Sequence, residues 1–202
     1  MKKVITHSIC MLVMITSIAT GFASNISSLK AEEKSMEITL TLDNVKEGQQ
    51  LFIKDIDGTI LYKKVLDKKG IFSNTYDFTA LPAGSYYFEH EKDFQIKLIP
   101  FKVTYNKVTF DKANEKTIFK PVLNVKDSCL YFSKLDLEKG TVKINIFHDN
   151  EIENTGYHLV HSENFKNALK IERIYSLTST NKGNYKVVIS ANGRDFVEYF
   201  SI

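Results

Sequence analysis

From Met36 onward the chain alternates between apolar and polar residues. In the first such stretch, residues 36–42, every second residue is apolar and the residues between are Glu or Thr. An apolar face at every second position is typical of a β-strand that is buried on one side. Similar stretches recur at short intervals, and none carries a sustained helical stripe. The pattern therefore predicts an all-β fold, with helix limited to one turn near Glu163–Leu169.

Short turn sequences separate the apolar runs. Residues 51–53 and 60–62 flank Asp55-Ile56-Asp57-Gly58, in which the Asp-Gly pair suits a tight hairpin turn. The same residues are similar to the start of a calcium loop, but the later acidic ligands are missing from Thr59–Tyr62. We therefore expect a hairpin at this point and not a metal site.

The order of strands and turns occurs twice, which predicts an internal duplication. Each copy contains a strand, a polar turn, a strand, a variable connection and then Gly-x-Tyr, at Gly84–Tyr86 and again at Gly183–Tyr185. The connection from the turn to this motif is longer in the second copy, Asn150 to Gly183, than in the first, Gly58 to Gly84.

Two such copies predict two tandem, small antiparallel β-sandwich domains of the Ig-like type. We place domain 1 at residues 36–120 and domain 2, a repeat of domain 1, at residues 121–202. Pro121 suits an edge or a crossing between domains, because proline cannot donate a hydrogen bond to a strand ladder.

The N-terminus has the composition of an export signal. Lys2 and Lys3 precede a mostly apolar run over 4–19, and Gly21-Phe22-Ala23 places small residues where a signal peptidase cuts. The apolar run is shorter than the roughly 20 residues that a membrane-spanning helix needs. The sequence therefore favours a cleaved signal over a permanent anchor.

We expect residues 1–23 to be the signal peptide, with cleavage after Ala23 or, as the later alternative, after Ala31. Residues 24–35 are polar and lack periodicity, as in a flexible leader. The mature chain is then exported, to the periplasm, the cell surface or the medium, and carries no integral membrane span.

Charge and cysteine content exclude two classes of partner or bond. The chain has 27 Lys and Arg against 24 Asp and Glu, and removal of Lys2 and Lys3 leaves 25 against 24. Because the remaining cations are not clustered, we expect no nucleic-acid partner. Cys10 lies in the predicted signal, so Cys129 is left without a partner for an intramolecular disulfide.

Histidines supply the one motif with metal-ligand spacing. His158 and His161 form H-x-x-H, and His148-Asp149 lies nearby in the sequence. On a strand this spacing places the two side chains on opposite faces, although on a helical turn it would suit one ion. No G-x-S-x-G motif or local Cys–His pair is present. We expect no catalytic, metal or cofactor-binding residues, no cofactor, and no enzymatic activity.

The aromatic cluster from Tyr86 to His90 offers the other candidate site. Alternation assigns Tyr86 and Phe88 to a core and leaves Tyr87 and Glu89 facing outward. Packing in a strand is the main interpretation, and a platform for a ligand is the alternative.

A sequence motif in the same segment carries a resemblance. The run Leu81-Pro82-Ala83-Gly84-Ser85-Tyr86-Tyr87-Phe88 resembles the L-P-x-G-x-Y segment of secreted β-sandwich modules from Bacteroidetes, including the C-terminal sorting domains of type IX secretion. Residues 183–202 are similar to the final hairpin of such modules, but Asn181-Lys182 replaces Leu-Pro. The resemblance implies an Ig-like architecture and a Bacteroidetes-like origin.

These observations predict an exported, non-enzymatic structural or interaction module of the cell envelope. Its expected partner is an envelope protein or glycan, with weak self-association through an edge strand. A carbohydrate- or peptide-binding accessory protein is the alternative. A small hydrolase is a third hypothesis, which requires ionisable groups that converge in a cleft.

Overall fold

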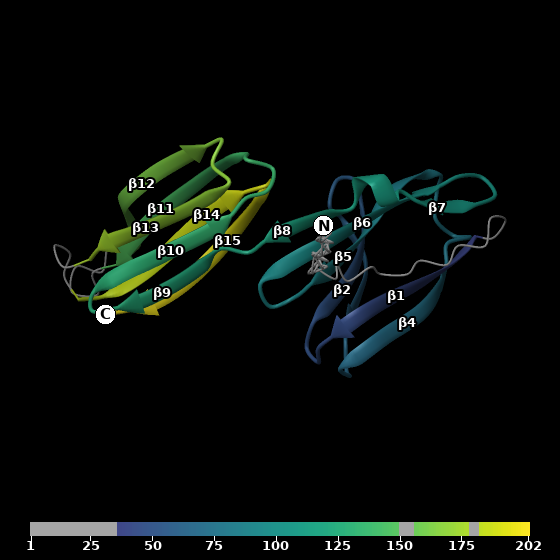
Figure 1. The fold of residues 1–202 in the computed structure, drawn as a ribbon, viewed down its shortest axis with the longest axis horizontal. Coiled ribbons are helices and arrows are strands. Elements are labelled where there is room, and N and C mark those ends of the chain that lie inside the picture. The colour runs from purple at the N-terminus through teal and green to yellow at the C-terminus, as the bar shows by residue number, and fades with distance from the viewer. Residues whose placement is uncertain (1–35, 150–155, 178–181) are drawn as a thin grey trace, which may run out of the picture.

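The computed structural model describes residues 36–149, 156–177 and 182–202, so the predicted signal peptide and leader lie outside the described residues. Within them the fold is all-β and antiparallel, which confirms the predicted fold class (Figure 1). The one helical segment described is a 3₁₀ turn, Lys112–Asn114. A helical turn near Glu163–Leu169 was the wrong prediction, because pairing with a neighbouring strand holds residues up to Lys166 in extended conformation.

The strands of the described residues follow in chain order. They are β1 (Glu37–Val45), β2 (Gln50–Asp55), β3 (Ile60–Val65), β4 (Gly70–Asp77), β5 (Gly84–Glu91), β6 (Gln95–Val103), β7 (Val108–Phe110), β8 (Lys116–Phe119), β9 (Val122–Lys126), β10 (Cys129–Leu135), β11 (Thr141–Asp149), β12 (His158–Lys166), β13 (Lys170–Ser176), β14 (Asn184–Ala191) and β15 (Arg194–Ser201).

The strands up to β8 form the first sandwich. One sheet pairs β1 with β4, and the other has the order β3-β2-β5-β6-β7, with β8 also paired to β6. The alternation that predicted β1 is the reason for its burial: Ile38, Leu40 and Leu42 are at most 2% exposed, while the residues between them are less buried. Phe88 from β5 and Phe101 from β6 meet these side chains in the same core.

The strands from β9 onward form the second sandwich, which lies end to end with the first (Figure 1). Its sheets have the orders β13-β10-β9 and β12-β11-β14-β15, and they enclose a separate core. Alternation is again the cause, since Tyr185, Val187 and Ile189 on β14 are all fully buried. The all-β fold with paired sheets fits an immunoglobulin-like module.

Six strands of each sandwich have the same pairings, β1 to β6 in the first and β10 to β15 in the second. Tyr86 on β5 and Tyr185 on β14 therefore occupy corresponding places, and each stacks on a Phe of the next strand, Phe101 at 5.7 Å and Phe200 at 5.2 Å between ring centroids. The hydroxyl of Tyr86 donates to the backbone oxygen of Pro82 at 2.9 Å. This bond is the tyrosine corner found in many immunoglobulin-like sandwiches.

Two turns follow the sequence prediction closely. The hairpin between β2 and β3 turns at Gly58, whose φ of 85° is a conformation that glycine adopts without strain. Between the sandwiches, β8 ends at Phe119 and β9 begins at Val122, so Pro121 lies between two strands of different sheets. The predicted domain division at 120/121 stays a prediction, because a change of sheet is not a test of independent folding.

The two Gly-x-Tyr glycines are expected to differ in their tolerance of alanine. A Cβ at Gly183 would lie 2.6 Å from the backbone oxygen of Asp149 and 2.7 Å from Nε2 of His148, whereas a Cβ at Gly84 would lie at ordinary contact distance, 3.4 Å, from the Tyr86 ring. Gly183→Ala should therefore lower the free energy of unfolding by roughly 1–3 kcal/mol, as overpacking does. Gly84→Ala is the matched control, and equal urea midpoints for both variants would contradict the expectation.

Candidate functional site: the groove at the junction of the two sandwiches

Strand β5 carries the residues around which the site is built. Tyr86 and Phe88 point into the first core, as predicted, and Tyr87 and Glu89 lie on the outer face of the sheet. Glu89 is nevertheless only 2% exposed, so the expectation that it faces outward into solvent was wrong. The physical reason is Arg194 at the start of β15, which covers Glu89 from the second sandwich.

Glu89 is held by two cations. Both oxygens of its carboxylate accept hydrogen bonds from Arg194, from Nη1 at 3.1 Å and from Nη2, and Nζ of Lys54 donates to Oε1 at 3.0 Å. Burial by itself would raise the pKa of Glu89, but the hydrogen bonds from Arg194 and Lys54 outweigh it and lower this pKa below its ordinary value. The Glu89 carboxylate is therefore ionised at neutral pH and serves as an anchor between the two sandwiches.

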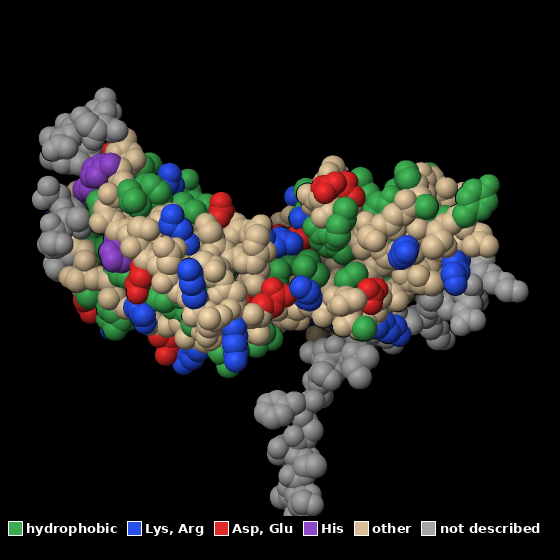
Figure 2. All heavy atoms as spheres, turned by 90° about the horizontal axis from the view of Figure 1, so that it is seen from above, with side chains coloured by type: hydrophobic (Ala, Val, Ile, Leu, Met, Phe, Trp, Pro, Cys, Tyr) green, Lys and Arg blue, Asp and Glu red, His purple; other side chains and the backbone are tan. Residues whose placement is uncertain are grey.

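Two further polar contacts cross the junction. Nζ of Lys116 on β8 lies 2.9 Å from Oε1 of Glu138, and Nζ of Lys134 on β10 donates to the backbone oxygen of Phe119 at 2.9 Å. Nδ2 of Asn192 donates to Oε2 of Glu138 at 3.2 Å, so the β14–β15 turn joins the same network. Figure 2 shows acidic and basic side chains gathered where the two halves of the molecule meet. These contacts restrict the orientation of the sandwiches and give the groove between them a defined shape.

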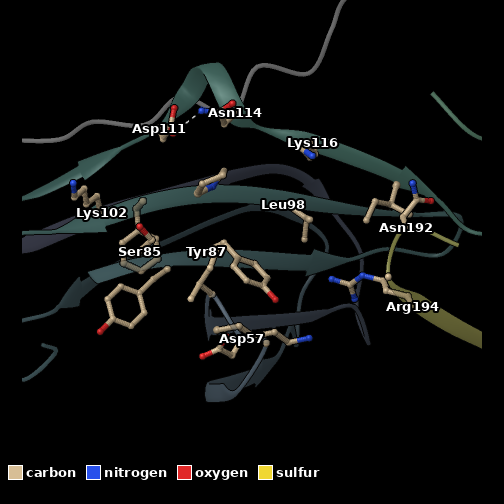
Figure 3. A pocket seen from close by; sticks show the side chains of 18 residues that line it. Asp57, Ser85, Tyr87, Leu98, Lys102, Asp111, Asn114, Lys116, Asn192 and Arg194 are labelled. Carbon is tan, nitrogen blue, oxygen red and sulfur yellow. Dashed lines mark hydrogen bonds between the residues drawn. The ribbon is translucent and has the colours of Figure 1, made fainter. Parts of the chain in front are cut away.

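Beside these contacts lies an open groove of about 780 Å³, which we call the junction groove. Its walls come from the outer face of β5 and β6, the β2–β3 turn, the 3₁₀ turn and the β14–β15 turn. In Figure 3, Tyr87 lies in the middle, with Lys102 and Ser85 at one end and Asn192 and Arg194 at the other. The apolar residues of the groove are Ile56, Leu98, Pro100 and Ile118, and its charged residues are Lys54, Asp57, Lys102, Asp111, Lys116 and Arg194.

The groove offers hydrogen-bond donors and an aromatic ring. Burial and the nearby Glu89 carboxylate raise the pKa of Tyr87, so its phenol is neutral and can donate a hydrogen bond at physiological pH. Oδ2 of Asp111 accepts from Nδ2 of Asn114 at 2.7 Å, which orients both side chains at the rim. Neutral and cationic donors around a half-buried ring can recognise carbonyl, hydroxyl or carboxylate groups of a ligand.

The predicted metal motif has a different geometry from the one expected. His161 pairs with Ile146 and His158 with His148 across β11–β12, with a register shift between the two pairs. This bulge places both histidines opposite core-facing residues, so the expectation of opposite faces was wrong. The ring of His161 lies against Tyr175, 5.0 Å away, and that of His158 against His148, 5.7 Å away. No group of three His, Cys, Asp or Glu within the described ranges could hold a metal ion.

The other sequence candidates are explained by local structure. Oδ1 of Asp55 accepts from the backbone nitrogens of Asp57 and Thr59, so this carboxylate stabilises its own turn, as the hairpin prediction requires. Cys129 is a free thiol at the start of β10 and is partly buried. The helices of the described part of the chain include none that is long and apolar enough to cross a bilayer.

Sequence reasoning identified Tyr87 but missed Arg194, Lys54 and Asn192. A signal for Arg194 was present, because Asn192-Gly193 is a strong two-residue hairpin turn that places the following charge near the tip of the last hairpin. Glu89 was a second signal, as an acid within an aromatic strand. What no local pattern could supply is the pairing of the two residues across the junction.

Comparison with known proteins adds little to this geometry. No known protein family matches the chain, and no curated protein matches it. Among solved structures, a biofilm-associated protein's BSP domain aligns with 11% identity and a TM-score of 0.29, over 87% of this chain and 29% of that chain. The human OSCAR ligand-binding domain aligns with 8% identity and a TM-score of 0.25, over 87% and 97%.

A third solved structure, native alpha-2-macroglobulin from Escherichia coli, aligns with 14% identity and a TM-score of 0.25, over 87% of this chain and 70% of that chain. The present chain thus spans less than a third of the biofilm-associated structure. Superpositions this distant establish neither a family nor a function. The functional argument rests on the site itself.

Proposed function

We propose that this protein is an exported, non-enzymatic interaction module of the cell envelope that binds an extended segment of a partner protein in the junction groove. The observation that carries the proposal is the groove itself, which is lined by both sandwiches and braced by the buried Glu89–Arg194 pair. A site of fixed shape with few charges to neutralise is suited to holding a ligand. Export is proposed from the composition of residues 1–23.

The ionisable groups near the groove support binding over catalysis. Glu89 is sequestered between Lys54 and Arg194, and its lowered pKa makes it a poor proton donor. The raised pKa of Tyr87 makes the phenol a poor base. A general acid or base instead needs a pKa near the working pH. The proposal therefore assigns these groups to structure and recognition.

A glycan is the second candidate ligand, and the position of Tyr87 favours it. Tyr87 lies among Asn114, Asn192 and Asp57, which are side chains that bind sugar hydroxyls. Two ligand arms separate the candidates: peptide libraries on one side and isolated envelope glycans on the other. Binding of a glycan and of no peptide would replace the main proposal with this one.

Tyr87→Ala is expected to weaken binding of the partner at least tenfold, because the ring at the centre of the groove is lost. Tyr105→Ala is the matched control, since Tyr105 is fully exposed and does not line the groove. The measurement is photo-crosslinking on envelope fractions, followed by titration of the captured partner against both variants. Equal affinities of the two variants, or capture that maps to residues outside the groove, would reject the proposal.

A further inference from the structure

Strand β12 forms an outer edge of the second sandwich. Within the described chain it pairs with β11 and lies first in the sheet order β12-β11-β14-β15. Its residues Leu159 and Val160 are 53% and 37% exposed, which is unusual for adjacent aliphatic side chains on a free edge. Figure 2 looks down on the side of the molecule that carries β12 and shows hydrophobic side chains close to the histidines. The edge therefore combines backbone groups available for pairing with apolar surface to bury.

The corresponding strand of the first sandwich is protected in a way that β12 is not. Strand β3 has the same place in its sheet, but it carries Lys63 and Lys64, and lysine on an edge strand opposes the approach of another strand. Residues His158–Ser162 of β12 contain no Lys, Arg, Asp, Glu or Pro. The two related edges thus differ in the feature that controls edge-to-edge pairing.

Strand β4 is another uncharged edge, but its outer face is polar. The hydroxyls of Thr75 and Ser73 on β4 already hydrogen-bond to those of Thr39 and Thr41 on β1. Pairing along β4 would bury little apolar surface beyond Ile71, whereas pairing along β12 would bury Leu159 and Val160. Because apolar burial drives most protein association, β12 is the edge better suited to bind a strand.

We propose that β12 pairs with β12 of a second copy of this chain, in antiparallel orientation. The charge pattern favours this occupant, because a strand rich in acids or bases finds no ionic partner along His158–Ser162, while an identical strand meets an equally uncharged one. The one acid that follows, Glu163, is held within its own chain by Arg173 at 3.0 Å and Tyr175 at 2.8 Å. Antiparallel pairing of one strand with itself is two-fold symmetric and closes the assembly at a dimer.

The dimer is expected to be weak, with a dissociation constant on the order of 0.1 mM, since one short strand pair buries less than a standard interface. Val160→Lys should raise that constant at least tenfold, because the two-fold axis brings two lysines into the interface. Leu61→Lys on β3 is the matched control and should leave self-association unchanged, its side chain being 44% exposed on the protected edge. Sedimentation equilibrium of the purified protein from micromolar to millimolar concentration measures all three.

Concentration-dependent protection of the backbone amides of His158–Ser162 against hydrogen exchange provides a second readout. Both substituted side chains are exposed, so thermal unfolding is expected to match the parent chain and folding defects can be recognised. Dimerisation lost in Val160→Lys and kept in Leu61→Lys supports the proposal. A monomer at every concentration, or a dimer that survives Val160→Lys, overturns it.

Discussion

Arg194→Ala is expected to lower the free energy of unfolding by about 3 kcal/mol, the low end of the range for breaking a buried ion pair. The substitution leaves the Glu89 carboxylate, whose side chain is 3% exposed, with Lys54 as its remaining ion-pair partner. An uncompensated buried charge is costly because water cannot reach it. Urea unfolding followed by tyrosine fluorescence measures the loss, and solution scattering reports whether the two sandwiches also change their relative orientation.

Two variants separate this mechanism from general surface electrostatics. Lys170→Ala breaks an ion pair with Glu172 in which both side chains are 63% exposed, and it should change stability by no more than about 0.5 kcal/mol. The double variant Glu89→Leu/Arg194→Leu removes both charges and should recover most of the loss. If Arg194→Ala is as mild as Lys170→Ala, the Glu89–Arg194 pair does not brace the junction.

Lowering the pH from about 6.5 to about 4 is expected to cost about 3 kcal/mol of stability through one histidine. His90 is 1% exposed, and its Nε2 lies 2.9 Å from Oε1 of Gln49. Burial, followed by the positive charges of Lys92 and Lys97, lowers the pKa of His90 from 6.5 to about 4. The folded protein therefore excludes a proton that the unfolded chain binds.

The sign follows from proton uptake. Between pH 6.5 and 4 the unfolded chain carries the proton on His90 and the folded chain does not, so acidification favours unfolding. Above pH 6.5 the imidazole is neutral in both states and its contribution is constant. The acids Glu89 and Asp93 have pKa values lowered from 4.5 and 3.8, so they contribute at the acidic end of this range and below it.

His90→Gln is expected to flatten the dependence of the urea midpoint on pH between 4.5 and 6.5, because glutamine keeps a donor for Gln49 but does not titrate. His161→Gln is the matched control, since His161 lies on the edge strand β12 with its side chain 46% exposed. A slope that persists in His90→Gln would show that another group controls the acid response.

Much of the fold was predictable because strand alternation is a local property. The side chains of β1 and β14 alternate between core and surface whatever strand lies beside them, so Ile38 and Tyr185 could be placed in a core from the sequence. The Asp-Gly turn after β2 and the break at Pro121 were likewise predictable from backbone preferences of single residues. The Gly-x-Tyr motif correctly indicated a strand start in both halves.

Errors occurred where a neighbouring strand decides the conformation. Residues 163–166 are held extended by β11, which overrides their weak local preference for a helical turn. The faces of His158 and His161 depend on a bulge in the same pairing, and a bulge leaves no clear mark in the sequence. Propensity and periodicity describe single strands, whereas both of these features belong to a pair of strands.

The sequence by itself determined an all-β chain built from alternating strands, because apolar burial at every second residue needs no information about distant partners. The tertiary structure alone decided the site. Glu89 and Arg194 are separated by 105 positions in the chain and meet because two sandwiches come together end to end. The burial of that pair, the groove beside it and the exposed edge of β12 arise from the way completed sheets pack, which no local pattern encodes.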